Sequence, residues 1–240
     1  MKFIVANIKQ NGDERFFCDY AKTLGKLVKN PTNLLVAIPS VYLHLSKNFA
    51  KHNIVVGAQN ISSFAKGAYT GEVGANMVKE MGCQFTIVGH SERRNLLAET
   101  NEQIKAKINQ AKQNSLTVIL CVGENLEDRK KYKSVLASQI DAALSGTDLD
   151  NIMLAYEPVW AISTSGTGKI ATIDDIKTIH AYIKEYISKK YNTTLPILYG
   201  GSVKPSNCEE ILALDCVDGV LVGGASLKPE DFAKIYLSQK

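Results

Sequence analysis

Eight short apolar runs alternate with longer segments of helical periodicity along the chain. The runs show no clean alternation of apolar and polar residues, which is typical of strands buried on both faces. Eight strand–helix units of roughly 30 residues match the ~250 residues typical of a closed parallel barrel. We therefore predict an α/β fold, a (β/α)8 barrel with outer helices, in a single domain spanning residues 1–240. The expected strands are Phe3–Ile8, Leu34–Ile38, Ile54–Ala58, Gln84–Gly89, Leu116–Val122, Ile152–Tyr156, Pro196–Tyr199 and Val217–Val222.

Local signals indicate where some helices begin. Thr172 followed by Asp175 resembles an N-terminal capping pattern, ahead of isoleucines that recur at helical spacing. Pro205 and Pro229 are expected in the first turns of the seventh and eighth helices, where proline loses no hydrogen bond. No segment has the Pro/Gly/Ser content of a linker, which favours one domain over two.

Composition and charge argue against several classes of protein. Hydrophobic residues make up 45% and charged residues 22% of the sequence, an ordinary globular balance. The net charge of +4 suits a small anionic ligand, and no Lys/Arg run is dense enough to indicate nucleic acid binding. Because Lys9 interrupts the N-terminal apolar run and no stretch is as long as a membrane span, we expect neither a signal peptide nor a membrane segment. The five cysteines are dispersed and lack a CxxC pair, which favours a reducing compartment and hence the cytoplasm.

Five polar segments follow apolar runs, namely ANIKQNG, VGHSERR, AYEPVW, LYGGS and LVGGAS. In a parallel barrel the carboxyl ends of all strands lie on one rim, where catalytic groups gather. The segments therefore bring Asn7, Lys9, His90, Glu157 and Ser202 to one rim, and this arrangement predicts an enzyme.

The first two segments supply a cation and a hydrogen-bond donor. Asn7 and Lys9 are two residues apart, so on an extended segment they share a face, and a lysine there suits a phosphate or a developing oxyanion. His90 precedes an expected helix, whose positive dipole end should keep the imidazole neutral. A neutral imidazole can donate a hydrogen bond to a carbonyl oxygen. Local capping is the alternative for His90.

Two glutamates lie at the ends of expected strands. Glu157 should be partly desolvated beside Trp160 and hence more basic, which suits a general base, although a structural salt bridge is the alternative. Glu124 has a similar local sequence, and there we favour a structural role. The SERR run resembles a buried ion cluster that holds loops, although Glu92 could contact Lys9.

Glycine pairs follow the seventh and eighth expected strands, in the segments Gly200-Gly201-Ser202 and Gly223-Gly224-Ala225-Ser226. Glycines let backbone N–H groups approach an anion, and these two loops are the usual phosphate site of such a barrel. The segment STSGTGK, residues 163–169, does not match a Walker A loop, because it lacks the first glycine and the Ser or Thr after the lysine. We interpret it as a glycine-rich lid.

The longest irregular stretch runs from Gln59 to about Gly74. Loops longer than ~12–15 residues in compact domains are usually functional or disordered. This one contains Phe64, Tyr69 and Val73 and is too apolar for a disordered tail. We expect it to dock onto a partner; packing against its own barrel is the alternative.

These motifs make the chain similar to the triosephosphate isomerase family nearly from end to end. The resemblance rests on ANIK, GAQN, GAYTGEVG, IVGHSERR, LCVGE, AYEPVWAI, LYGGSV and GVLVGGASL. It implies reversible isomerisation of dihydroxyacetone phosphate and glyceraldehyde 3-phosphate. No metal or organic cofactor is implied, because the sequence has neither a ligand cluster nor a dinucleotide fingerprint. The resemblance also implies a homodimer through the Gln59–Gly74 loop, with Thr70 reaching toward the neighbouring subunit's site.

The roles of single residues follow from the same resemblance. Glu157 resembles the family's catalytic base and His90 its neutral electrophile, while Lys9 and Asn7 resemble the residues that hold the phosphate and the developing oxyanion. The phosphate-binding positions correspond to Ser202, Gly223 and Gly224, completed by a lid amide from Ser163 or Gly166.

Two departures from the family pattern stand out. Ile8 replaces the tryptophan of Asn-Trp-Lys, but strand alternation should point Ile8 away from Asn7 and Lys9. The lid reads PVWAISTSGTGK in place of PVWAIGTGK, and its three extra residues leave Ser163 and Gly166 both open as the phosphate contact. Two alternative functions stay open here: another phosphosugar isomerase or epimerase on the same barrel, or a non-catalytic phosphometabolite-binding protein.

Overall fold

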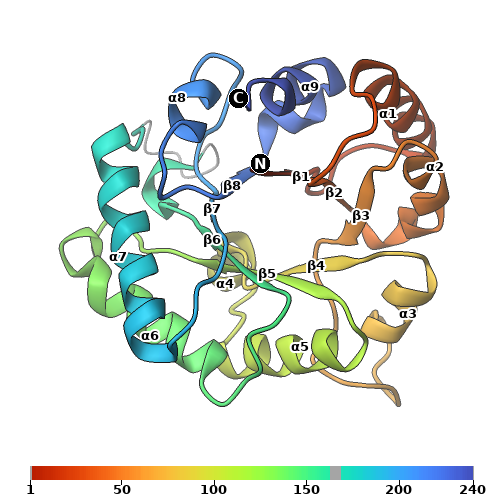
Figure 1. The fold of residues 1–240 in the computed structure, drawn as a ribbon. Helices are drawn as coiled ribbons and strands as arrows, with labels where there is room; N and C mark the ends of the chain where they lie inside the picture. The colour runs from red at the N-terminus through yellow and green to blue at the C-terminus, as the bar shows by residue number, and fades with distance from the viewer. Residues whose placement is uncertain (1, 163–168, 240) are drawn as a thin grey trace.

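Eight parallel strands pair in chain order, and the last strand pairs with the first to close a barrel. The computed structural model describes residues 2–162 and 169–239, and Figure 1 shows the strands at the centre with helices around them. The predicted (β/α)8 barrel is confirmed. The strands are β1 (Phe3–Asn7), β2 (Leu34–Ile38), β3 (Val55–Ala58), β4 (Phe85–Val88), β5 (Thr117–Val122), β6 (Ile152–Tyr156), β7 (Ile197–Tyr199) and β8 (Gly219–Val222).

Strand residues alternate between two cores. On β1, Val5 lies in the barrel interior beside Leu35 and Leu221, whereas Ile4 and Ala6 pack in the layer between the strands and the helices. Because both strand faces are apolar and buried, the runs show no polar alternation. The largest error in the predicted strand ends is at β8, where the Val217 N–H closes a turn on the Leu214 carbonyl (3.1 Å) and delays the strand start by two residues.

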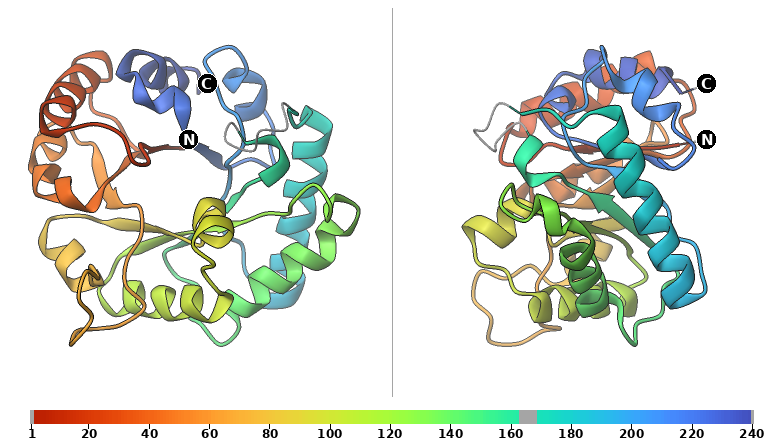
Figure 2. Two further views of the ribbon diagram at one scale, coloured as in Figure 1. Left: turned by 180° about the vertical axis from the view of Figure 1, so that it is seen from behind. Right: turned by 90° about the vertical axis from the view of Figure 1, so that its left-hand side faces the viewer.

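The helices cover the outside of the barrel (Figure 2). In the described part of the chain, no helix has both the length and the apolar character needed to cross a membrane. The helices are α1 (Glu14–Leu27), α2 (Ser46–Ala50), α3 (Ala75–Glu80), α4 (Ser91–Leu96), α5 (Asn101–Gln113), α6 (Tyr132–Leu144), α7 (Ile173–Tyr191), α8 (Cys208–Leu212) and α9 (Pro229–Leu237).

Two of the three predicted helix starts are confirmed. Thr172 and Asp175 form a capping box at α7, and Pro229 is the first residue of α9. The prediction for Pro205 is wrong, because α8 begins three residues later. The Asn207 side chain accepts a hydrogen bond from the Lys204 N–H (2.8 Å) and donates one to the Ser202 carbonyl (3.0 Å), which holds the intervening residues in a turn.

The segment between β3 and α3 projects from the barrel, as the orange loop in Figure 2 shows. Within this segment the rings of Phe64 and Tyr69 stack with centroids 4.0 Å apart. Both side chains stay substantially exposed, at 47% and 43%. The Ser62 N–H also donates to the Val73 carbonyl (2.8 Å), so the loop is closed at its base while the aromatic pair stays exposed.

Candidate active site

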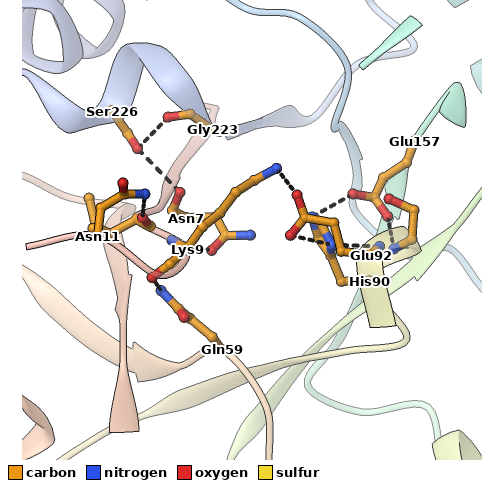
Figure 3. A network of polar contacts seen from close by, with 11 residues as sticks. Asn7, Lys9, Asn11, Gln59, His90, Glu92, Glu157, Gly223 and Ser226 are labelled. Atoms are coloured by element: carbon orange, nitrogen blue, oxygen red, sulfur yellow. Dashed lines mark hydrogen bonds and ion pairs between the residues drawn. The ribbon is translucent and has the colours of Figure 1, made fainter. Parts of the chain in front are cut away.

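A cavity of about 640 Å³ opens at the carboxyl ends of the strands. It brings together every described residue that the sequence predicted for the site: Asn7, Lys9, His90, Glu157, Ser202, Gly223 and Gly224. The two candidate lid contacts, Ser163 and Gly166, lie outside the described residues. Figure 3 shows the polar network that connects several of these side chains.

Asn7 and Lys9 reach the cavity by a turn and not by strand alternation. β1 ends at Asn7, and Lys9 adopts a left-handed backbone with φ of 54°, so the predicted shared strand face is wrong. The Lys9 N–H donates to Asn7 Oδ1 (3.1 Å), and the Lys9 carbonyl accepts a hydrogen bond from Gln59 Nε2 (3.0 Å). The Lys9 ammonium pairs with Glu92, a contact that the sequence raised as possible. Ile8 is fully buried in the outer core, away from both residues, as expected.

Glu157 follows β6 and is held against the neighbouring strand. Its N–H donates to the Val122 carbonyl (2.8 Å). A Cβ on Gly123 would lie 1.8 Å from the Glu157 carbonyl oxygen, so only glycine allows this approach. The Glu157 side chain is 3% exposed; its Oε2 accepts the Ser91 N–H (2.9 Å), and its Oε1 lies 2.9 Å from His90 Nε2.

The surroundings of Glu157 differ from the prediction in one respect. Burial raises the pKa of Glu157, but the facing His90 and the Ser91 N–H together lower it by more than burial raises it. The pKa therefore lies below its ordinary value. The indole Nε1 of Trp160 donates to Glu124 Oε1 (2.8 Å). The expectation that Glu157 is more basic than an ordinary glutamate is therefore wrong for this arrangement.

Glu124 takes the structural position that the sequence favoured. Its Oε1 accepts hydrogen bonds from Trp160 and from the Tyr156 hydroxyl (3.0 Å), and burial raises the pKa of its carboxyl. Sequence reasoning missed Arg129, whose guanidinium lies 4.0 Å from the Trp160 ring centroid and pairs with Asp175 (2.7 Å) at the start of α7. Neither a motif nor a spacing marks Arg129 in the sequence. Arg129 thus contacts Trp160, which precedes residues 163–168, and Asp175, which follows them.

His90 is the N-terminal cap of α4. Its Nδ1 accepts the Glu92 N–H (3.2 Å), which leaves the ring hydrogen on Nε2, facing Glu157. Burial lowers the pKa of His90, yet the Glu157 carboxylate raises it more, and the net shift is upward. The helix start alone therefore does not keep His90 neutral; the bond from Glu92 to Nδ1 favours the neutral ring, whereas Glu157 opposes it.

The glycine loops close the cavity on its other side. A Cβ on Gly200 would lie 3.0 Å from Glu157 Cγ, and one on Gly223 would lie 3.4 Å from Lys9 Cε. A short 3-10 helix (Gly224–Leu227) follows β8, and its Ser226 hydroxyl bonds to the Gly223 carbonyl (2.6 Å) and contacts the Asn7 carbonyl (3.4 Å), as Figure 3 shows. The β8 loop is thus attached to the end of β1.

The class of the protein follows from this site, because the closed barrel holds a carboxylate, an imidazole, a lysine and glycine loops in one cavity. These features are typical of (β/α)8-barrel enzymes that act on small anionic substrates by proton transfer. Within the described residues, no three or more His, Cys, Asp or Glu side chains are grouped so that they could hold a metal ion.

Comparison with known proteins gives the family. The sequence profile described as "Triosephosphate isomerase" matches residues 2–239. Proteins of that name are 40% identical over 245 residues in Hydrogenovibrio crunogenus (97% of this chain and 96% of the relative) and 41% identical over 244 residues in Halorhodospira halophila (98% and 96%). A crystal structure of triosephosphate isomerase from Bartonella henselae has a TM-score of 0.89 and 36% identity, covering 99% of this chain and 98% of that chain. The chain therefore belongs to the triosephosphate isomerase family.

The protein is accordingly an isomerase that interconverts dihydroxyacetone phosphate and glyceraldehyde 3-phosphate, and the usual role of this activity is in glycolysis. The resemblance seen in the sequence is confirmed over the whole described chain. The two alternatives, another phosphosugar enzyme and a non-catalytic binding protein, are not favoured.

Proposed function

We propose that Glu157 is the general base of this isomerisation and that His90, Lys9 and Asn7 stabilise the enediolate. One observation supports the assignment most directly: Glu157 Oε1 lies 2.9 Å from His90 Nε2 in the cavity that Lys9 also lines. A carboxylate and a hydrogen-bond donor can therefore act on adjacent atoms of one small substrate.

The proton moves between neighbouring carbons through Glu157. The carboxylate removes a carbon-bound proton next to the carbonyl and returns a proton to the adjacent carbon. Both carboxylate oxygens accept hydrogen bonds, from the N–H groups of Ser91 and His90, and a substrate that draws His90 away removes one contact that lowers the pKa of Glu157. Burial, which raises the pKa of Glu157, then acts with less opposition, and the carboxylate becomes a stronger base.

The enediolate needs donors that are already oriented. His90 presents Nε2–H, Lys9 presents its ammonium, and the Asn7 amide lines the same cavity. General acid–base catalysis contributes about 10²–10⁴-fold, and one oxyanion donor about 10²–10³-fold. The oxyanion donors therefore carry a large share of the rate enhancement in this proposal.

The phosphate is assigned to the glycine loops. Ser202, Gly223 and Gly224 line the cavity after β7 and β8, where backbone N–H groups suit an anion. A lid amide from Ser163 or Gly166 completes this part of the proposal, and both residues lie outside the described chain.

A coupled assay with inhibitor binding tests the assignment. We expect glyceraldehyde 3-phosphate to be converted and a phosphoglycolate-type inhibitor to compete with it. Glu157→Gln should abolish most of kcat, because the amide cannot accept the proton, while inhibitor affinity stays close to that of the unmodified protein. Retained kcat in this variant would exclude Glu157 as the base.

We further propose a homodimer in which the Gln59–Gly74 loop enters the partner subunit. The stacked Phe64 and Tyr69 of this loop would otherwise expose an aromatic surface. A cavity of about 580 Å³ adjoins the substrate cavity and shares Lys9 and His90 with it, and Leu96 and Leu97, which are 78% and 63% exposed, form part of its lining. The exposed leucines of this cavity suit the aromatic side chains of a second copy's loop, and the exchange can be reciprocal in a twofold dimer.

We also propose that the chain forms one domain in the cytoplasm. The pairing of β8 with β1 joins the two ends of the chain in one sheet, which supports a single domain. All five cysteines are free, which suits a reducing compartment.

A further inference from the structure

The end of β5 extends past its neighbour β4. Val88, the last residue of β4, pairs with Leu120, whereas β5 remains paired with β6 as far as Val122. Along a strand, the backbone groups of successive residues face opposite neighbours. The Val122 carbonyl accepts the Glu157 N–H on the β6 side (2.8 Å). The next residue, Gly123, therefore turns its N–H and its carbonyl to the side on which β4 has already ended.

Gln139 of α6 bonds to the backbone groups that β4 leaves unpaired. Its Oε1 accepts the Gly123 N–H (2.9 Å), and its Nε2 donates to the Gly123 carbonyl (2.9 Å). One side-chain amide thus satisfies both backbone groups of one residue, which a neighbouring strand would otherwise do. Arg94 supports the same edge two residues earlier, where its Nη2 donates to the Cys121 carbonyl (3.1 Å). Side chains therefore hold the end of β5 in place of a strand.

Gly123 lies directly against the residue that carries the proposed base. A Cβ on Gly123 would lie 1.8 Å from the Glu157 carbonyl oxygen and 2.8 Å from its carbonyl carbon. Because the two backbones are packed so closely, a displacement of Gly123 is transmitted to Glu157. Gln139 and Glu157 both line a cavity of about 210 Å³, whereas the described lining of the substrate cavity includes Glu157 and not Gln139. Gln139 can thus act on the base without contacting the substrate.

We propose that Gln139 is a positioning residue for the isomerisation, which holds Gly123 and through it the backbone that carries Glu157. The inference rests on the proposed role of Glu157 as the base. Catalysis by a base depends on its distance from the proton that it removes, so a small displacement of the carboxylate lowers the rate of the chemical step. Binding of the phosphate is assigned to the loops after β7 and β8, which Gln139 does not contact among the described hydrogen bonds. Loss of Gln139 should therefore lower kcat and leave KM nearly unchanged.

Gln139→Met tests this role. Methionine has nearly the length and the helix propensity of glutamine, but it offers neither the amide oxygen nor the N–H donor that Gly123 requires. We expect kcat in the coupled assay to fall about tenfold or more, while KM changes by less than about twofold.

Asp141→Ala is the matched control on the same helix. Asp141 accepts hydrogen bonds from the hydroxyls of Tyr186 (2.7 Å) and Tyr191 (2.8 Å), which attach α6 to α7, and the described linings of the two cavities do not include it. The substitution removes two hydrogen bonds of α6, as Gln139→Met does, but away from Gly123. It should lower the melting temperature and keep kcat within about twofold of the unmodified protein.

His90 gives a spectroscopic reading of the same displacement. Burial lowers the pKa of His90, and the Glu157 carboxylate raises it by more. When Gln139→Met lets the carboxylate move away, the midpoint of His90 in an NMR titration should fall. Asp141→Ala should leave this midpoint unchanged, because it attaches α6 to α7 without involving Gly123.

Gln139→Glu is a second variant should Gln139→Met fail to fold. Its carboxylate still accepts the Gly123 N–H but sets a second oxygen against the Gly123 carbonyl, so kcat should fall here too. Retained kcat in the folded variant would overturn the proposal, and so would an equal loss of kcat in Asp141→Ala or an unchanged midpoint for His90. Failure of the proposed base looks different, because Glu157→Gln would then continue to isomerise the substrate.

Discussion

Glu157→Asp tests the position of the base without changing its charge. The substitution withdraws the carboxylate by one C–C bond, about 1.5 Å. The present contacts of 2.9 Å to Ser91 N–H and His90 Nε2 would then lengthen past hydrogen-bond range unless the backbone followed. The backbone cannot follow easily, because a 2.8 Å bond to the Val122 carbonyl and the close approach of Gly123 fix it.

Misplacement by about 1 Å can cost about 10²-fold in rate, which corresponds to about 2.7 kcal/mol of transition-state stabilisation. We expect kcat in the coupled assay to fall by at least that factor, with a small change in KM, because the phosphate loops are untouched. Glu124→Asp is a matched control: it shortens another buried glutamate, one that does not line the substrate cavity. It should reduce the melting temperature but keep most of kcat. Near-normal turnover in Glu157→Asp would refute the assignment of the base.

Three further outcomes test other contacts. In Glu157→Gln, NMR titration should give a lower pKa for His90 than in the unmodified protein, since burial lowers this pKa and only the carboxylates near the ring offset it; an equal or higher midpoint would contradict the pairing. Replacing Phe64 and Tyr69 together by serine should shift analytical ultracentrifugation at micromolar concentration toward the monomer, and an unmodified protein that is monomeric and fully active would argue against the dimer. Arg129→Met should change the fluorescence spectrum of the only tryptophan, because it removes the stacked cation, whereas Arg129→Lys should give a spectrum closer to that of the unmodified protein. Identical spectra in all three proteins would exclude the contact.

The barrel was predictable because burial on both strand faces leaves a strong signal. Each of the eight apolar runs became a strand, and the capping box at Thr172 marked the start of α7 correctly. The errors arose where a side chain competes with regular structure. Asn207 holds a turn ahead of α8, so the helix starts later than Pro205 suggested.

The site residues were predictable by position but not by contact. The carboxyl ends of parallel strands meet on one rim, so the segments after β1, β4 and β6 had to come together. Which side chains pair across that rim depends on distances that no local pattern encodes. Trp160 thus contacts Glu124 where the sequence suggested Glu157, and Arg129 went unnoticed because its partners lie 31 and 46 positions further along the chain.

The turn at Lys9 links the proposed dimer to the chemistry. A non-glycine residue at φ of 54° costs roughly 1–2 kcal/mol, so its neighbours must hold it there. Gln59 is the first residue of the loop that we propose enters the partner subunit. Its side chain donates hydrogen bonds to the Lys9 carbonyl (3.0 Å) and to the Ala37 carbonyl (3.1 Å) of its own chain. A partner that immobilises this loop therefore also immobilises Gln59 and the Lys9 backbone, while Glu92 pairs with the Lys9 ammonium. The Glu157–His90 pair joins β6 to β4 and does not depend on the loop. If the protein dimerises as proposed, an isolated protomer should keep its base but hold the backbone of Lys9 less firmly, and its kcat should be lower than that of the dimer.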